Sequence, residues 1–194
     1  MGSSKAAKAK SHERIVRTAA ARFRERGVDG MGVADLMKES GLTHGGFYGH
    51  FGSREQLVDE AVECALQDGG RAVKAIAGAK APPATVLAAL TDAYLSLAHR
   101  DGLATSCAVA TMANDVARSS PRARKAYTKQ VNQYLELLAG LIAAEKRKGR
   151  RAKAIAALSA LVGAVAMARA VNDEKLSREI LKSAADELKA LFGR

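Results

Sequence analysis

Apolar residues recur at three- and four-residue intervals along nearly the whole chain, which places them on one face of a helix. Ile15, Ala19 and Phe23 follow this spacing near the N-terminus. No run of alternating β-branched and polar residues between turn signals predicts a strand. The pattern therefore predicts an all-α protein of about nine helices, over residues 11–26, 33–40, 43–51, 53–74, 83–99, 105–118, 122–147, 151–171 and 175–192.

Glycine, proline and capping residues divide these helices into groups. Gly27 follows the first helix, and Ser53 forms a capping-box pair with Gln56 three residues later. Pro82 and Pro83 interrupt the helical pattern most clearly, because proline removes a backbone donor and disfavours helix in the residue before it. We therefore predict a flexible basic arm over 1–10, a small helical domain over 11–58, a linking helix and connection over 59–80, and a larger helical domain over 81–194.

The first 51 residues have the pattern of a helix-turn-helix, a motif whose second helix enters the major groove of DNA. The turn falls at Gly41, and the helix-turn-helix proper covers about 33–51. A small domain needs large side chains for its core. Half of the eight aromatic residues of the chain lie in this region, at Phe23, Phe47, Tyr48 and Phe51.

Three glycines, Gly45, Gly46 and Gly49, fall in the short helix predicted after the turn. Each costs about 1 kcal/mol relative to alanine inside a helix, so this helix needs packing from Phe47 and Phe51 to persist. Glycine also lets the backbone approach a groove or a phosphate closely. The alternative interpretation is that 44–50 forms a mobile loop.

The N-terminal region resembles the TetR family of bacterial transcription regulators, closely over residues 11–60. The resemblance rests on Gly27-Val28-Asp29-Gly30, on Val33-Ala34-Asp35-Leu36 and on Gly41-Leu42-Thr43-His44-Gly45-Gly46-Phe47-Tyr48-Gly49-His50-Phe51-Gly52-Ser53-Arg54-Glu55. Residues 102–121 and 166–171 resemble, less specifically, the ligand-binding domains of one branch of the family. The sequence departs from the family at Met31-Gly32, where threonine and serine commonly cap the next helix, and at Met37, where a small alanine is usual.

The resemblance implies a homodimeric DNA-binding regulator, a repressor that a small-molecule effector releases from a palindromic double-stranded operator. It also implies roles for residues of the DNA-binding segment. Thr43 would cap the recognition helix and reach a phosphate, His44 would meet a base edge or a phosphate, and the backbone at Gly45 and Gly46 would lie close to the groove. The positions that match phosphate-contacting or basic residues of the family are Tyr48, His50 and Arg54.

The charge balance of the chain bears on the kind of partner that it binds. Lysine and arginine number 31 against 20 acidic residues, which gives a formal net charge of +11 and favours nucleic acid or an anionic membrane surface as a partner. A non-specific nucleic-acid or membrane-surface binding protein is therefore the alternative to a regulator. The two cysteines have no paired spacing, which excludes a disulfide framework or a cysteine-rich metal site and fits a reducing cytoplasm.

One stretch, from Ile155 to Ala168, is apolar on all sides, which the surface helix of a monomer does not tolerate. It is shorter than the roughly 20 residues of a membrane span, and the N-terminus lacks the apolar core of a secretory signal. We therefore expect a cytoplasmic protein with no membrane partner. We predict that the helix over 151–171 pairs with the helix over 175–192 in a twofold four-helix dimer interface. The alternative is burial within one subunit.

The larger domain offers few bulky side chains for an effector pocket, and the candidates are Tyr94, Met112, Tyr127 and Tyr134. Cys107 joins them because it begins the helix predicted over 105–118, where backbone donors and the helix dipole favour a thiolate. It is therefore a candidate sensor of electrophiles, and the alternative is a small apolar core residue.

His99, Asp101 and Cys107 together suggest a cysteine hydrolase, since such an enzyme needs a base beside its nucleophile. No glycine-rich elbow, metal-ligand cluster or nucleotide loop accompanies them in the sequence. We therefore expect no enzyme activity, no cofactor and no metal.

Overall fold

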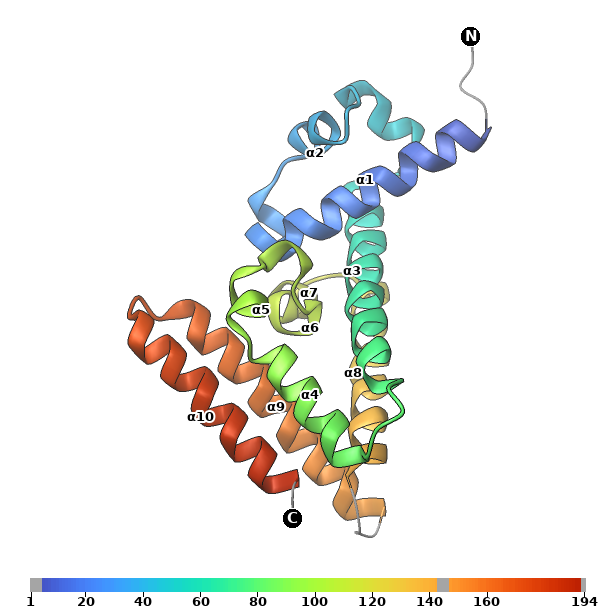
Figure 1. Ribbon diagram of the computed structural model, residues 1–194. Helices are drawn as coiled ribbons and strands as arrows, with labels where there is room; N and C mark the ends of the chain where they lie inside the picture. The colour runs from blue at the N-terminus through green and yellow to red at the C-terminus, as the bar shows by residue number, and fades with distance from the viewer. Residues whose placement is uncertain (1–4, 143–146, 193–194) are drawn as a thin grey trace.

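The predicted all-α class is confirmed by the computed structural model, which describes residues 5–142 and 147–192 and contains only helices and their connections within those ranges (Figure 1). With η marking 3₁₀ helices, the elements are α1 (Lys5–Arg26), η1 (Val28–Gly30), α2 (Val33–Glu39), η2 (His44–Gly49), α3 (Arg54–Ala77), α4 (Pro83–Tyr94), α5 (Leu97–Asp101), η3 (Leu103–Thr105), α6 (Ala108–Thr111), α7 (Ala113–Ala117), α8 (Pro121–Leu141), α9 (Arg147–Ala170) and α10 (Glu174–Phe192).

The N-terminal helices close around a small aromatic core. Phe23, Phe47 and Phe51 are buried, and the rings of Phe47 and Phe51 stack with their centroids 5.4 Å apart. α1 ends at Gly27, whose φ is +76°, and α2 is followed by Gly41 at φ +68°. This left-handed region favours glycine, so both predicted helix ends are confirmed.

The segment after this turn is the 3₁₀ helix η2, and the predicted α-helix over 43–51 is therefore wrong. Its backbone bonds have the tighter spacing: the Gly46 N–H donates to Thr43 O at 3.0 Å and the His50 N–H donates to Phe47 O at 2.8 Å. Three glycines leave the segment little helix propensity, and the buried Phe47 ring holds it in place. The segment is neither an α-helix nor the loop of the alternative interpretation.

The first helix also begins earlier than predicted. α1 begins at Lys5, so Ser11 lies inside a helix and does not cap it. The run from Lys5 to Lys10 contains only lysine and alanine, which are strong helix formers, and this extends the helix into the predicted flexible arm. Residues 1–4 of that arm lie outside the described residues.

The capping box at the start of α3 is confirmed in a modified form. The Ser53 Oγ accepts a hydrogen bond from the Gln56 N–H at 3.1 Å, as predicted. The reciprocal bond goes one residue further back, where the Gly52 N–H donates to Gln56 Oε1 at 2.8 Å. α3 then continues without a break past Gly69 and Gly70.

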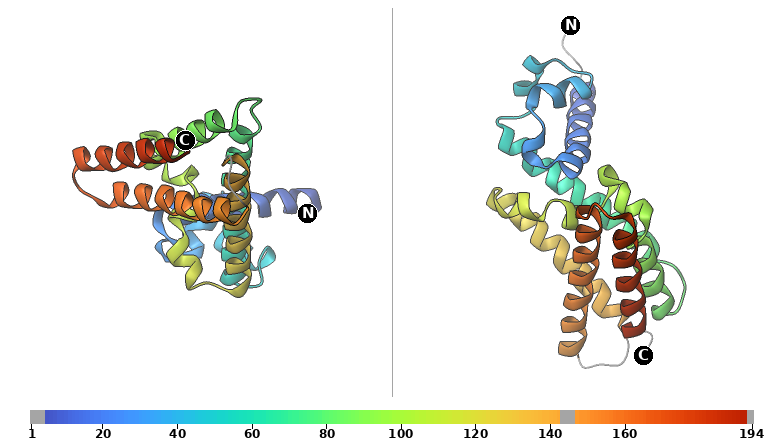
Figure 2. Two further views of the ribbon diagram at one scale, coloured as in Figure 1. Left: turned by 90° about the horizontal axis from the view of Figure 1, so that it is seen from below. Right: turned by 90° about the vertical axis from the view of Figure 1, so that its left-hand side faces the viewer.

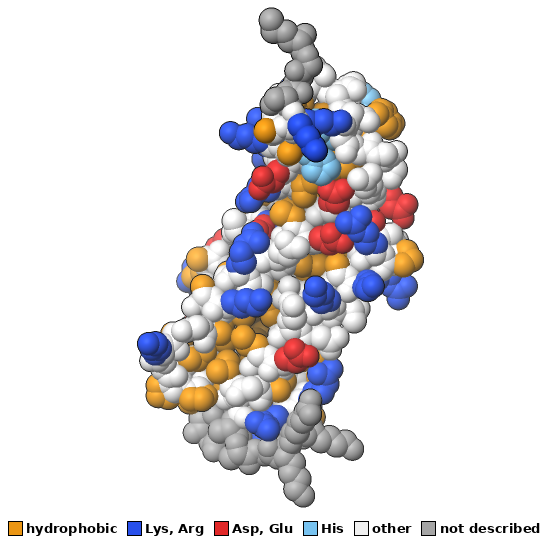
Figure 3. Space-filling view, turned by 90° about the vertical axis from the view of Figure 1, so that its right-hand side faces the viewer, with side chains coloured by type: hydrophobic (Ala, Val, Ile, Leu, Met, Phe, Trp, Pro, Cys, Tyr) orange, Lys and Arg blue, Asp and Glu red, His pale blue; other side chains and the backbone are white. Residues whose placement is uncertain are grey.

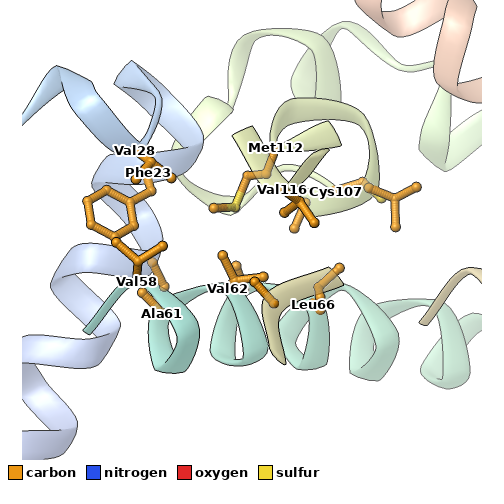
Figure 4. Packing of buried hydrophobic residues seen from close by; sticks show 14 of the residues in the cluster. Phe23, Val28, Val58, Ala61, Val62, Leu66, Cys107, Met112 and Val116 are labelled. Atoms are coloured by element: carbon orange, nitrogen blue, oxygen red, sulfur yellow. The ribbon is translucent and has the colours of Figure 1, made fainter. Parts of the chain in front are cut away.

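α3 runs from the N-terminal helices down along the larger part (Figure 1), and its buried apolar residues join the two parts. Figure 4 shows Val58 and Val62 on α3, with Phe23 facing one end of this row and Met112 and Val116 facing the other. All five belong to a single buried cluster that continues into α8 and α9. The N-terminal helices and the larger part therefore share one hydrophobic core.

The larger part contains more breaks than the sequence predicted. The helix predicted over 83–99 ends at Tyr94, and Ser96 begins α5 by accepting a hydrogen bond from the His99 N–H at 3.1 Å. The helix predicted over 105–118 is divided among η3, α6 and α7, and Cys107 lies at the start of a helix of only four residues.

The next two predicted helices differ from the structure at their ends. α8 begins at Pro121, where the Ser120 Oγ accepts from the Ala123 N–H at 3.1 Å, and it ends at Leu141. Residues 143–146, in the last part of the helix predicted over 122–147, lie outside the described residues. The predicted gap between the helices over 122–147 and 151–171 contains Gly149, which lies inside α9.

α9 and α10 lie side by side along one side of the molecule (Figure 2). Leu161 and Val165 of α9 are buried against Leu181 and Leu188 of α10, together with Leu95. One segment of α9, Gly149–Ala170, is long and apolar enough to cross a membrane by length and composition alone. One of its faces is nevertheless packed against α8 and α10, as in the core helix of a globular protein.

The other face of α9 is uncovered and apolar. Met167 is 55% exposed and Ile155 is 46% exposed. α10 adds two exposed side chains, Leu176 and Leu191. We call Ile155, Met167, Leu176 and Leu191 the outer face of α9 and α10. Burial within one subunit covers one side of the apolar helix and leaves this face without a cover among the described residues.

Candidate nucleic-acid interface and ligand cavity

The 3₁₀ helix η2 presents an aromatic side chain to solvent. Tyr48 is 75% exposed, and its ring meets the buried Phe47 ring edge-on with centroids 5.2 Å apart. His44 and Gly45 are exposed on the same turn. The buried neighbour therefore positions a phenol hydroxyl, an imidazole and a bare backbone segment on one small surface.

Thr43 occupies the position before η2 in an extended conformation, but its hydroxyl makes no capping hydrogen bond. The predicted capping interaction is thus wrong, while the exposed hydroxyl stays able to meet a phosphate. A Cβ on Gly45 would meet nothing within 4 Å, whereas one on Gly46 would lie 3.6 Å from the Met37 Cε. Gly46 therefore faces α2, where a Cβ would make ordinary van der Waals contact with Met37.

His50 lies beneath this surface. Its Nδ1 is buried without a hydrogen-bond partner among the described residues, and its ring centroid is 6.0 Å from that of His12. The His12 Nε2 lies 2.6 Å from Glu60 Oε2. Burial, with the nearby positive charges of His12 and Lys8, lowers the pKa of His50. A neutral imidazole at neutral pH meets a phosphate by a hydrogen bond and contributes no charge.

The Arg54 guanidinium contacts other residues of the protein. Its Nη2 donates to the Val28 backbone oxygen at 2.6 Å, and its Nη1 lies 3.5 Å from Asp29 Oδ1. These contacts tie the turn after α1 to the start of α3. The sequence places Arg54 among the phosphate contacts, and the structure adds this tethering role.

A cavity of about 150 Å³ lies in the larger part. Of the predicted pocket residues, the structure brings Tyr94, Cys107 and Tyr134 to its wall. The rest of the wall is mostly aliphatic and comes from α3, α4, α8 and α9, with Val73, Ile76, Leu90, Leu138 and Leu158 among its members. Figure 3 views the side on which α3 and α8 lie, and it shows apolar side chains gathered in a hollow in the lower half.

Two predicted pocket residues lie elsewhere. Met112 is fully buried in the core against α3, and the Tyr127 hydroxyl donates to the Val109 backbone oxygen at 2.8 Å. His99 also lines the wall, which the sequence did not predict because the helix expected over 83–99 gave no sign of the break after Tyr94. Gly69 is a second unpredicted wall residue, and a Cβ there would lie 3.0 Å from the Tyr134 hydroxyl oxygen.

The polar groups of the cavity wall are few. The Tyr94 hydroxyl is buried without a hydrogen-bond partner among the described residues. Burial, with the adjacent Cys107 thiol, raises the pKa of Tyr94 well above its usual value. The His99 Nδ1 lies 2.6 Å from the Tyr94 backbone oxygen, to which it donates, and its Nε2 accepts from the Cys107 N–H at 3.1 Å. Burial lowers the pKa of His99, which keeps the ring neutral.

Comparison with known proteins identifies the family to which this architecture belongs. Residues 15–61 match the family model described as bacterial regulatory proteins, tetR family. Over 169 residues the chain is 30% identical to an uncharacterized HTH-type transcriptional regulator of Mycobacterium tuberculosis (strain CDC 1551 / Oshkosh), an alignment that covers 83% of this chain and 85% of that protein. The chain belongs to the TetR family. It is a DNA-binding transcriptional regulator with an N-terminal helix-turn-helix and a helical C-terminal domain.

Two further similarities agree with this TetR-family assignment. The chain is 30% identical over 133 residues to the HTH-type transcriptional repressor KstR2 of Rhodococcus jostii (strain RHA1), covering 68% of this chain but only 63% of that protein. The fold superposes with a TM-score of 0.82 on the crystal structure of a TetR transcriptional regulator from Chloroflexus aurantiacus J-10-FL, at 24% identity and over 96% of each chain.

The hydrolase alternative finds no support in the geometry around Cys107. A general base must offer a free lone pair to the thiol, and the His99 Nε2 lone pair already accepts the Cys107 backbone N–H. The Asp101 carboxylate pairs with Arg100, at 2.7 Å from its Nε. Within the described residues, no group of three or more His, Cys, Asp or Glu side chains is placed to hold a metal ion.

Proposed function

We propose that this TetR-family protein is a cytoplasmic, homodimeric repressor that binds a palindromic operator through η2 and is released by a small molecule in the C-terminal cavity. The observation that carries the proposal is the exposed Tyr48, fixed on the buried Phe47 at the surface of a helix-turn-helix. The residues proposed to meet DNA are Thr43, His44, Gly45, Gly46, Tyr48, His50 and Arg54. Catalysis has no part in this proposal.

Selection of bound sequences from a random DNA pool tests the proposal directly. A repressor of this kind enriches one palindromic site and binds it far more tightly than random DNA at physiological salt. A purely electrostatic binder, the alternative based on the net charge of +11, enriches no site and loses affinity steeply with salt. An unenriched pool would therefore decide for the alternative.

Two single substitutions separate phosphate contacts from base contacts. Tyr48→Phe removes only a hydroxyl, so we expect it to weaken binding to all sequences alike, by about tenfold. His44→Ala is expected to change which bases are preferred in the selected site. Competition between the selected operator and point-mutated operators measures both effects, and the reverse outcome would contradict this division of roles.

The effector proposal rests on how the cavity connects to the DNA-binding helices. Cys107 lines the cavity and belongs to the same buried cluster as Met112 and Val116, which face α3 (Figure 4). α6 also contacts α1 and α9. A ligand that favours one arrangement of these helices alters the separation of the two recognition segments of a dimer. By linkage it then weakens operator binding, typically by about 1 to 3 kcal/mol.

Cys107 remains a candidate sensor thiol. The dipole of its four-residue helix is small, so the support comes from its place in the cavity wall. We expect iodoacetamide to weaken operator binding at least fivefold in the unmodified protein. The same response is expected of Cys64→Ser, because burial raises the pKa of the Cys64 thiol and so disfavours its reactive thiolate. Cys107→Ser is expected to be indifferent to the reagent. Fluorescence anisotropy of labelled operator DNA measures the binding of each protein before and after treatment. If the reagent weakened operator binding equally in all three proteins, Cys107 would be a core residue and not a sensor.

A further inference from the structure

The Tyr94 hydroxyl is a buried polar group that the protein leaves unsatisfied. Its oxygen is inaccessible and has no hydrogen-bond partner among the described residues, although the side chain forms part of the cavity wall. Buried hydroxyls nearly always have a partner, because an unpaired one has lost its water without compensation. An unpaired hydroxyl in the wall of a cavity therefore points to a ligand that completes the bond.

The neighbouring polar groups are engaged elsewhere. Both ring nitrogens of His99 are used, one by the Tyr94 backbone oxygen and the other by the Cys107 N–H. The Thr105 hydroxyl donates to the Gly102 backbone oxygen at 3.3 Å. What remains in the wall beside Tyr94 is the Cys107 thiol, which is a weak donor and a weak acceptor, and the Tyr134 hydroxyl, which lies next to that thiol. The phenol proton is thus available to an incoming acceptor.

The cavity also limits the size and charge of its occupant. An apolar cavity of about 150 Å³ accommodates a molecule of about the size of benzene. No lysine, arginine, aspartate or glutamate lines it among the described residues. Burying a charged group there without a partner is strongly unfavourable, which disfavours carboxylates and amines.

We propose that the effector is a small uncharged carbonyl compound, whose hydrocarbon part fills the cavity and whose oxygen accepts a hydrogen bond from the Tyr94 hydroxyl. This inference deepens the proposed function and rests on it only where it calls the ligand an effector. Tyr94 is then the residue that distinguishes a carbonyl compound from a hydrocarbon of the same shape.

Three probes of nearly equal ring size test the ligand class. Cyclohexanone carries the carbonyl, methylenecyclohexane has the same shape without an acceptor, and cyclohexanecarboxylate carries a charge. In titration calorimetry of the full chain, we expect cyclohexanone to bind about tenfold more tightly than methylenecyclohexane, and cyclohexanecarboxylate not to bind. No binding of cyclohexanone, or equal binding of the hydrocarbon, would overturn the proposal.

Tyr94→Phe and Tyr127→Phe form a matched pair of variants. We expect Tyr94→Phe to lose the tenfold preference for cyclohexanone, to keep the affinity for methylenecyclohexane, and to melt no lower than the unmodified protein. Tyr127→Phe lies outside the cavity and loses the bond to Val109, so it is expected to keep the preference and to melt at a lower temperature. A lower melting temperature for Tyr94→Phe would show that its hydroxyl already has a partner, which the proposal excludes.

Operator binding by the same samples separates this inference from the proposed function. If a selected operator is bound but cyclohexanone is not, the inference fails and the repressor proposal stands. If cyclohexanone binds in a Tyr94-dependent way but no sequence is enriched from the DNA pool, the carbonyl site stands and the proposed function fails.

Discussion

Replacing Phe47 with alanine is expected to lower the free energy of unfolding by about 3–5 kcal/mol and to abolish specific operator binding. The Phe47 ring is 2% exposed, stacks on Phe51 and lies edge-on against Tyr48. Within η2 it is the buried side chain that ties a glycine-rich segment to the core. Urea unfolding followed by circular dichroism measures the stability, and fluorescence anisotropy with a selected operator measures the binding.

The adjacent residue supplies the control for this experiment. Tyr48→Ala removes an aromatic ring of similar size from the same segment, but that ring is exposed, so the free energy of unfolding should change by no more than about 0.5 kcal/mol. Operator affinity should still fall, because the proposed phosphate contact is lost. If Tyr48→Ala destabilised the protein as much as Phe47→Ala, the packing account of η2 would be wrong.

The N-terminal part shows which features local sequence can predict. Helix ends at Gly27, Gly41 and Ser53 were predicted because each depends on the chemistry of one residue and its near neighbours. The 3₁₀ conformation of His44–Gly49 was not, because three glycines leave the local preference weak and a buried ring decides the outcome. The start of α1 was misplaced because Ser11 is a good cap, but the lysine and alanine before it are better helix formers.

In the larger part, contacts between distant residues decide the structure. The region around Ser106 receives Arg169 of α9, whose guanidinium donates to the His99 backbone oxygen at 2.7 Å and to the Ser106 Oγ. No local pattern predicts such bonds across more than sixty residues of sequence, and they hold the segment that breaks the predicted helix. Tyr134, a candidate chosen for its bulk, lies in the cavity wall. Tyr127, two turns earlier on α8, lies at the level of Val109 instead.

Met167→Glu is expected to convert the proposed dimer to a monomer and to weaken operator binding at least a hundredfold. Met167 is the most exposed member of the outer face of α9 and α10. In a twofold interface each dimer would contain two new carboxylates, taken out of water with no cation assigned to pair with them. Analytical ultracentrifugation at micromolar concentration measures the assembly state, and anisotropy measures the DNA affinity.

Tyr48→Glu is the matched control, because it places the same charge on the most exposed large hydrophobic side chain among the described residues, far from that outer face. It should remain a dimer and lose operator binding, whereas Met167→Glu should lose both together. Met167→Glu should lose DNA binding together with dimerisation, because a monomer presents one recognition segment and can occupy only one half-site of the operator. A Met167→Glu protein that stayed dimeric would place the dimer interface elsewhere. If the unmodified protein sedimented as a monomer, the apolar face of α9 would need another partner and the palindromic operator would lose its basis.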